Sequence, residues 1–406
     1  MLGQFAWITA GRVTAAILQA LTFGALALLV TPAALGAVGT LLALLLVLQT
    51  LCDLGVSTYL VRTRAASPDD GRIRSAVVLN RITTVPLLLV GVVLAVVVSA
   101  LHDDVSLGML LPLAVWAAAE RNAETVAGIA LADGRASFTV FNLVLRRAVM
   151  AAGFFLLGWW GVEAILAYGL ASALGALLSV LWTNAVTPLP TARVALSTVA
   201  REARAYWANS VAVQARNLDV AVVSGVAGAA AAGVYSLASR LVVPLRLVPT
   251  SLATAVLPHA ARTREHDDRR RVMVNVAWIL GAVSVLYVGL ALTLPWVVAA
   301  FPGLEPVEPA VPATQILLLA LPFAASGSVA SALLQARGLA GFVSRVAVLM
   351  SAVCLVGAGV GGAVSGATGA AAAFAVALTL QAVVLGAKVR TVTREDVSQL
   401  HPVPDV

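Results

Sequence analysis

The residues of this chain with the greatest chemical potential are charged side chains inside long apolar stretches. Thirteen such residues occur, and each ionised group of this kind costs at least about 2.5–3.5 kcal/mol at the centre of a lipid-facing helix. We therefore expect most of them to face protein or a water-filled cavity. The nine arginines are Arg12, Arg81, Arg121, Arg146, Arg147, Arg216, Arg240, Arg246 and Arg345, and the four carboxylates are Asp53, Glu120, Glu124 and Asp219.

Arginines in a cavity of low dielectric constant favour an anionic ligand. The guanidinium group stays charged, and its planar fork matches phosphate oxygens, often through two hydrogen bonds. Nine positive groups against four negative ones leave a surplus that ion pairs within the set cannot remove. The sequence therefore predicts a substrate that carries phosphate or pyrophosphate. The residues predicted to bind it are Arg12, Arg121, Arg146, Arg147, Arg216, Arg240 and Arg246.

Two other roles compete for these arginines. Arg81 and Arg345 lie near the ends of their stretches, where long side chains can reach the lipid headgroups, and Arg12 is open to the same interpretation. Ion pairing inside the protein is the second role, because residues three or four apart share one face of a helix. The closest pairs of opposite charge are Arg216 with Asp219, and Arg121 with Glu120 and Glu124.

The four carboxylates also have two interpretations. Carboxylates within a membrane often act as relays, so Asp53, Glu120, Glu124 and Asp219 are candidates for coupling transport to a proton or sodium gradient. Salt bridges with nearby arginines are the alternative. Both interpretations place these side chains inside the protein.

No residue pattern typical of an enzyme or a metal site is present. The four histidines fall in no metal-spaced cluster, and both cysteines lie in apolar stretches. Gly357, Gly359 and Gly362 match the dinucleotide pattern GxGxxG, but no strand–turn–helix unit is expected there, so close helix packing explains them. We expect no enzymatic activity, no cofactor and no metal.

The apolar stretches themselves define the class of protein. Of 406 residues, 61% are hydrophobic and 11% are charged, whereas soluble domains average about 45–50% and about 25%. A helix needs about 20 apolar residues to cross a membrane. The sequence therefore predicts an all-α polytopic membrane protein and excludes a soluble enzyme or a secreted domain. Twelve spans are predicted, near residues 5–30, 35–61, 76–101, 107–131, 137–158, 163–184, 205–226, 231–258, 272–300, 312–336, 341–361 and 366–387.

Arginines in the connecting segments predict the orientation in the membrane. Segments 62–74, 193–204 and 262–271 are rich in arginine, whereas the alternate connections contain acids but neither arginine nor lysine. Because basic connections remain in the cytoplasm, we expect a multi-pass protein of the cell membrane with both termini cytoplasmic. These loops also account for the net charge of +7, so no nucleic-acid partner is expected.

The chain divides into two similar halves. The connection at 185–204, which contains Pro188 and Pro190, separates a predicted bundle of residues 1–190 from one of residues 191–406 with a short cytoplasmic tail. A tight glycine turn recurs at Gly36 and Gly233. Because each half has an even number of spans, the copies are related by an axis along the membrane normal. The predicted architecture is two parallel six-helix bundles around a central cavity, which suits alternating access.

Several segments resemble a known transporter family. Residues 36–43 (GAVGTLLA) and 52–57 (CDLGVS), followed by Arg62, are similar to the first helical hairpin of Wzx-like oligosaccharide flippases. These are the polysaccharide biosynthesis proteins of the multidrug/oligosaccharidyl-lipid/polysaccharide exporter (MOP) superfamily. Residues 216–219 (RNLD) and 233–240 (GVYSLASR) resemble the start of the family's second half, and residues 335–338 (QARG) resemble the exit of its tenth helix.

The resemblance implies a flippase that moves polyprenyl-pyrophosphate-linked oligosaccharide from the cytoplasmic to the outer leaflet. Cationic residues of the central cavity would engage the pyrophosphate. The implied partners are the lipid-linked oligosaccharide, membrane lipids, and a glycan polymerase and glycosyltransferases. Three alternatives stay open: a multidrug or metabolite exporter of the same superfamily, a major-facilitator transporter, and a non-transporting membrane scaffold of a glycan-synthesis complex.

Overall fold

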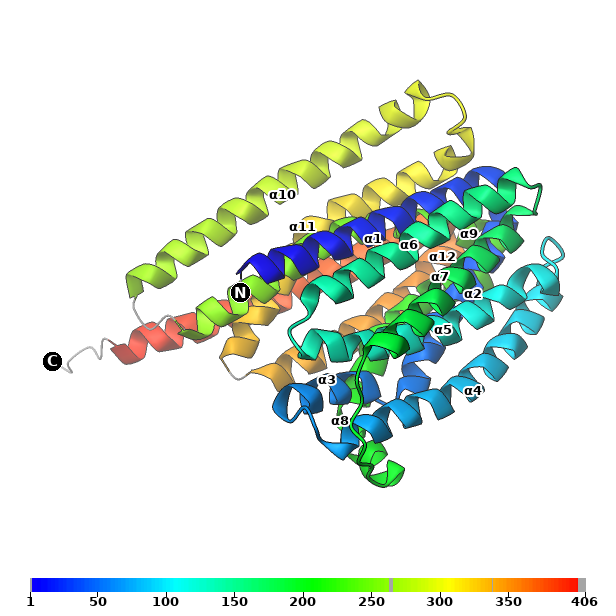
Figure 1. The fold of residues 1–406 in the computed structure, drawn as a ribbon. Helices are drawn as coiled ribbons and strands as arrows, with labels where there is room; N and C mark the ends of the chain where they lie inside the picture. Colours follow the sequence, from blue (N-terminus) through cyan, green and yellow to red (C-terminus); the bar gives the residue numbers. More distant parts are fainter. Residues whose placement is uncertain (1, 263–265, 338, 401–406) are drawn as a thin grey trace.

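The structure, a computed structural model, describes residues 2–262, 266–337 and 339–400. Within these ranges every regular element is a helix, and most of the long helices lie side by side (Figure 1). The elements are α1 (Leu2–Leu29), α2 (Pro32–Asp53), α3 (Val56–Ala66), α4 (Gly71–Leu101), α5 (Leu107–Ala132), α6 (Ala136–Trp159), α7 (Ala164–Val186), α8 (Leu196–Gln214), the 3-10 helix η1 (Ala215–Leu218), α9 (Asp219–Arg262), α10 (His266–Ala300), the 3-10 helix η2 (Glu305–Ala310), α11 (Val311–Ala336) and α12 (Ala340–Leu400).

Nine helical segments in the described part of the chain are long and apolar enough to cross a membrane, so the protein is a multi-pass membrane protein. This number is compatible with the twelve predicted spans because two helices contain breaks. The backbone is not helical at Gly228 in α9, nor at Ser365 and Gly366 in α12. If α9 and α12 are each counted as two crossings, the number rises from nine to eleven, and α8 together with the first part of α9 forms the seventh predicted span. The helix α5, which carries three charged residues, adds the twelfth crossing.

One predicted span, residues 35–61, is interrupted. The helix α2 ends at Asp53 and α3 begins at Val56, and the φ angles of Leu54 and Gly55 between them are 52° and 78°. A Cβ atom on Gly55 would overlap the carbonyl oxygen of Ala203 in α8. Glycine therefore permits both the left-handed backbone and the close approach of α8. The interruption places the carboxylate of Asp53 at a helix end inside the protein.

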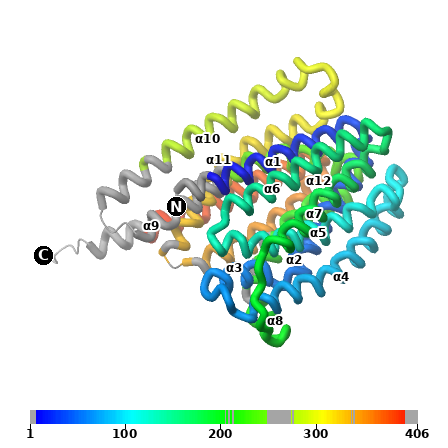
Figure 2. The backbone as a smooth tube through the Cα atoms, in the orientation of Figure 1, coloured from blue at the N-terminus to red at the C-terminus, as the bar shows by residue number. Residues whose placement is uncertain are grey.

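The helices form two groups, α1–α7 and η1–α12, which meet mainly along α2 and α9 (Figures 1 and 2). The helix α10 lies at the edge and packs mainly against α11. We call the end with the α3–α4, α5–α6 and α7–α8 connections the basic end, because Arg72 in the first turn of α4 and Arg135 and Arg193 in two of the connections lie there. The other end is called the opposite end.

The start of α8 packs on the N-terminal group of helices at the basic end. Val199 and Ala203 are buried there against residues of α3, α4 and α5. The hydroxyl of Tyr59 donates a hydrogen bond to Glu202 at 2.6 Å, and the indole N–H of Trp207 donates to the carbonyl of Leu51 at 3.0 Å. The predicted boundary between residues 190 and 191 falls in the connection that precedes this helix, and its role as a division between functional units stays a prediction.

Candidate functional site

A cavity of about 510 Å³ lies between the two groups of helices. Residues of α1, α2, α3, α5 and α6 form one wall, and residues of α8, η1 and α9 form the other. Both groups therefore contribute to one chamber, as the sequence predicts for a central cavity. The polar lining residues are Gln19, Gln49, Thr50, Asp53, Ser57, Thr58, Glu120, Arg121, Glu124, Arg147, Ser210, Gln214, Asn217 and Arg240.

A cluster of ion pairs joins α5 to α6 at the wall of the cavity. The carboxylate of Glu120 accepts a hydrogen bond from Nη2 of Arg147 at 2.5 Å and lies 3.3 Å from Nη1 of Arg146. Arg146 also lies 3.6 Å from Glu124. The side chains of Glu120 and Arg146 are each 4% exposed, whereas that of Glu124 is 60% exposed. Glu120 is therefore enclosed by its two arginines, and Glu124 presents its carboxylate to the cavity.

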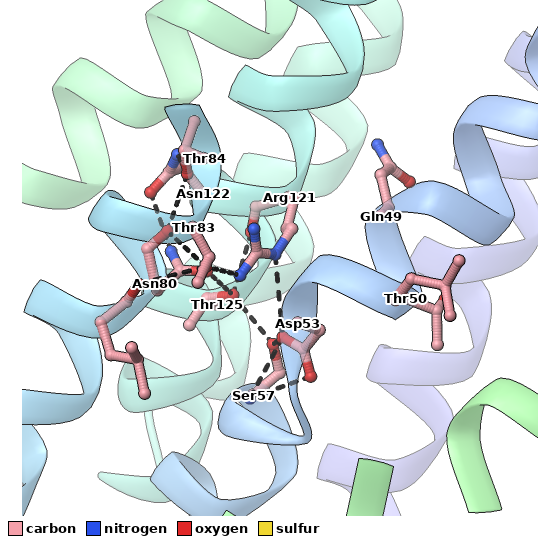
Figure 3. Close-up of polar contacts among 12 residues, drawn as sticks. Gln49, Thr50, Asp53, Ser57, Asn80, Thr83, Thr84, Arg121, Asn122 and Thr125 are labelled. Carbon is pink, nitrogen blue, oxygen red and sulfur yellow. Dashed lines mark hydrogen bonds and ion pairs between the residues drawn. The ribbon is translucent and has the colours of Figure 1, made fainter. Parts of the chain in front are cut away.

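Arg121 connects the cavity to a polar network at the break between α2 and α3 (Figure 3). Its Nη2 donates to the hydroxyl of Thr83 at 2.6 Å, and its Nε lies 3.9 Å from Oδ1 of Asp53. Asp53 accepts from the hydroxyl of Ser57 at 2.5 Å, and that hydroxyl lies 2.8 Å from Oγ1 of Thr125. The network ties α2, α3, α4 and α5 together. It holds Arg121 beside Asp53 rather than beside Glu120 or Glu124, its neighbours in sequence.

Arg240 contributes positive charge from the second wall of the cavity. Its guanidinium carbon lies 4.4 Å from the centroid of the Phe23 ring on α1, which is within cation–π distance. The contact crosses from the C-terminal to the N-terminal group of helices. Arg240 is thus positioned where a relative movement of the two groups would displace it.

The structure places Arg216 inside the C-terminal group of helices, away from the lining of the central cavity. It donates to the hydroxyl of Ser351 at 2.8 Å and to the side-chain oxygen of Gln381 at 3.0 Å. Asp219 accepts instead from the hydroxyl of Tyr235 at 2.7 Å. The Arg216–Asp219 pairing suggested by their spacing is therefore wrong, because packing gives each side chain a different partner.

Two further predicted arginines are absent from the lining of the cavity. The guanidinium carbon of Arg246 lies 4.5 Å from the centroid of the Phe374 ring, within the C-terminal group of helices. Arg12 is exposed on α1. The predicted set of seven phosphate-binding arginines is thereby reduced to Arg121, Arg147 and Arg240 at the cavity, with Arg146 directly behind them.

The charges at the cavity are close to balanced. Its three arginines face three carboxylates, those of Asp53, Glu120 and Glu124. Over all predicted spans, arginines outnumber carboxylates by nine to four. At the cavity this excess of positive charge is absent, because arginines such as Arg216 and Arg246 lie elsewhere. Among residues 2–262, 266–337 and 339–400, no group of three or more histidine, cysteine, aspartate or glutamate side chains could hold a metal ion.

Sequence reasoning missed the neutral polar residues of the cavity. Carboxamides and hydroxyls both donate and accept hydrogen bonds, which suits a ligand rich in hydroxyl groups. A signal was present in α2, where polar residues recur at a spacing of three or four in an otherwise apolar helix and so share one face. The main members of this polar wall are Gln19, Gln49, Thr50, Gln214 and Asn217.

Comparison with known proteins assigns a family to this sequence. Residues 25–303, well over half of the chain, match the family model described as "Polysaccharide biosynthesis protein". None of the curated proteins compared matches the chain.

Similar solved structures share the fold over nearly the whole chain. A MOP-superfamily transporter from Pyrococcus furiosus, described as having a binding pocket of reverse polarity that suggests a different function, is 13% identical with a TM-score of 0.67, covering 96% of this chain and 95% of that one. An outward-facing multidrug-resistance MATE transporter of the same superfamily is 14% identical, with a TM-score of 0.65 and coverages of 96% and 94%. A MATE transporter from Vibrio cholerae is 13% identical, with a TM-score of 0.65 and coverage of 97% of each chain. The chain therefore belongs to the polysaccharide biosynthesis protein family, with the fold of the MOP-superfamily transporters.

Proposed function

We propose that this protein is a flippase that carries polyprenyl-pyrophosphate-linked oligosaccharide from the cytoplasmic to the outer leaflet of the cell membrane by alternating access. The basic end would face the cytoplasm, with both termini, because its connections hold the arginines. A glycan polymerase and glycosyltransferases are the proposed partners, since they would use and supply the carried lipid.

The observation that carries this proposal is the set of cavity arginines drawn from both groups of helices. Arg121 and Arg147 come from α5 and α6, and Arg240 comes from α9. A pyrophosphate bound between them would be held by both halves of the transporter. Its contacts would therefore change as the halves move, which is the requirement for coupling ligand binding to a conformational change.

The polar wall supports a glycan as the group next to the phosphate. Gln49 and Thr50 on α2 face the chamber with Gln214 and Asn217 of the second wall. The volume of about 510 Å³ is within the range of about 300–1,000 Å³ that ligand pockets occupy. It would accommodate the linker and the sugars nearest to it, while the polyprenyl tail stays in the lipid.

Proteoliposomes test the proposal directly. The purified protein would be reconstituted with a fluorescent polyprenyl-pyrophosphate disaccharide, and the fraction of label quenched by an impermeant reductant would be followed over time. We expect Arg240→Gln to lower the rate of translocation at least tenfold. Arg345→Gln is the matched control, because Arg345 is exposed on α12 and bonds to the carbonyl of Gly341 in its own helix.

The alternatives give different results in the same vesicles. A drug exporter would move a cationic dye and leave the glycolipid, and a scaffold would move neither. Either result overturns the flippase assignment. Among the carboxylates, Glu124 is the one we propose for coupling to an ion gradient. Its side chain is 60% exposed in the cavity and pairs with Arg146 at 3.6 Å, whereas Asp53, Glu120 and Asp219 each accept a short hydrogen bond.

A further inference from the structure

The helices α2 and α9 touch without intervening side chains at a patch near the opposite end. A Cβ atom on Gly36 of α2 would overlap the carbonyl oxygen of Ala229 and lie 2.9 Å from the backbone nitrogen of Gly233 in α9. Conversely, a Cβ atom on Gly233 would overlap the carbonyl oxygen of Pro32 and lie 2.9 Å from the nitrogen of Gly36. The contact thus requires glycine on both sides.

The contact continues for one further turn of each helix. A Cβ atom on Gly39 would lie 2.5 Å from the hydroxyl oxygen of Ser236 and 2.8 Å from its Cβ. Residues three and four apart share one helix face, so Gly36, Gly39 and Thr40 form one surface of α2. Gly233 and Ser236 form the facing surface of α9. We call these five residues the glycine patch.

The same two helices separate to form the cavity. Along α2 the patch is followed by the lining residues Gln49 and Thr50, and along α9 it is followed by Arg240. At a rise of about 1.5 Å per residue, Gln49 lies about 15 Å beyond Gly39 toward the basic end. The bundles are therefore closed at the patch and apart at the cavity, which describes one of the two states that alternating access needs.

Two buried hydroxyl groups make this patch less favourable than an apolar contact of the same fit would be. The side-chain oxygens of Thr40 and Ser236 are inaccessible to solvent and have no hydrogen-bond partner within the described residues. Buried polar groups are nearly always satisfied in stable interiors, so an unsatisfied pair weakens the contact. Separation of α2 from α9 would expose both hydroxyls to water. The close fit of the two helices favours the closed contact, and the burial of two hydroxyl groups favours its opening. A contact that opens and closes during transport needs both properties.

We propose that the glycine patch is the gate that closes the cavity toward the opposite end, and that transport opens it by separating α2 from α9. This inference rests on the alternating access of the proposed function. Gly36 and Gly233 lie inside α2 and α9, not in the predicted glycine turns. These are the two helices along which the groups mainly meet, so the gate lies between the groups.

Distances between spin labels test the gate without any substrate. Labels at Leu29 and Ala230, both exposed at the opposite end, would be attached in a background in which Cys52 and Cys354 are replaced by alanine. Pulsed electron paramagnetic resonance then reports how far the α1–α2 turn lies from the start of the C-terminal part of α9. The protein with an intact patch should give mainly a short distance.

Enlarging either glycine should open this end. We expect Gly36→Ala and Gly233→Ala each to make a longer distance the major population. Gly281→Ala is the control, because a Cβ atom there meets nothing within 4 Å. A distance distribution unchanged by both patch variants, in folded protein, would overturn the gate.

A milder pair of variants covers the case in which the first two fail to fold. Gly39→Ala meets a side chain rather than backbone, so it should open the gate, and Ser236→Gly in the same chain should restore the short distance. Failure of this rescue would also overturn the proposal. A gate that responds as expected in a protein that does not flip glycolipid would refute the proposed substrate alone, so the two failures are distinguishable.

Discussion

Neutralising Glu120 should strongly destabilise the protein, because its buried carboxylate forms ion pairs with two buried arginines, Arg146 and Arg147. At an effective dielectric constant of about 20, charges 3.3 Å apart attract by about 5 kcal/mol, and desolvation offsets part of this. Removing one member of a buried ion pair costs about 3–5 kcal/mol. Arg146 retains Glu124 at 3.6 Å, whereas Arg147 loses its hydrogen-bonded carboxylate. We therefore expect Glu120→Gln to lower the free energy of unfolding by about 3 kcal/mol.

Thermal unfolding in detergent micelles measures this effect. Glu120→Gln should melt several degrees below the unaltered protein, while Asp104→Asn, which changes an exposed carboxylate, should melt with it. The double variant Glu120→Gln, Arg147→Gln removes the stranded charge as well, and we expect it to recover about 1 kcal/mol or more relative to the single variant. A single variant as stable as the unaltered protein, or a double variant no more stable than the single one, would refute the reasoning.

Three further results are expected. Gly55→Ala should lower the free energy of unfolding by about 2 kcal/mol or more, because alanine disfavours a positive φ angle and its Cβ would overlap the carbonyl of Ala203. Thermal unfolding measures this, and equal stability of Gly55→Ala and Gly281→Ala would contradict it. Ser236→Ala removes a buried hydroxyl without a partner, so the protein should become more stable by about 1 kcal/mol and its opposite end should open less often in the spin-label assay. Glu124→Gln should abolish the response of glycolipid translocation to a pH gradient across vesicles, and a response equal to that of the unaltered protein would remove Glu124 from the coupling step.

Much of the fold could be predicted from the sequence, because a membrane imposes a simple rule on it. Each crossing needs about 20 apolar residues, so the crossings and the two groups of helices follow from the pattern of apolar stretches. The interruption at Leu54 and Gly55 could not be predicted in this way. It depends on α8 approaching the backbone of Gly55 and on the hydroxyl of Ser57 meeting that of Thr125 in α5, and both are contacts between segments that are distant in sequence.

The sequence by itself determined the class of protein, its family resemblance and the presence of arginines too costly to leave in lipid. Only the tertiary structure decided which of them share the cavity. Arg121, Arg147 and Arg240 line it, whereas Arg216 bonds to Ser351 within the C-terminal group of helices. The physical reason is rotation about the helix axis. Helices that are apolar on every side carry little signal of which face turns inward, so packing against neighbouring helices sets the direction of each charged side chain.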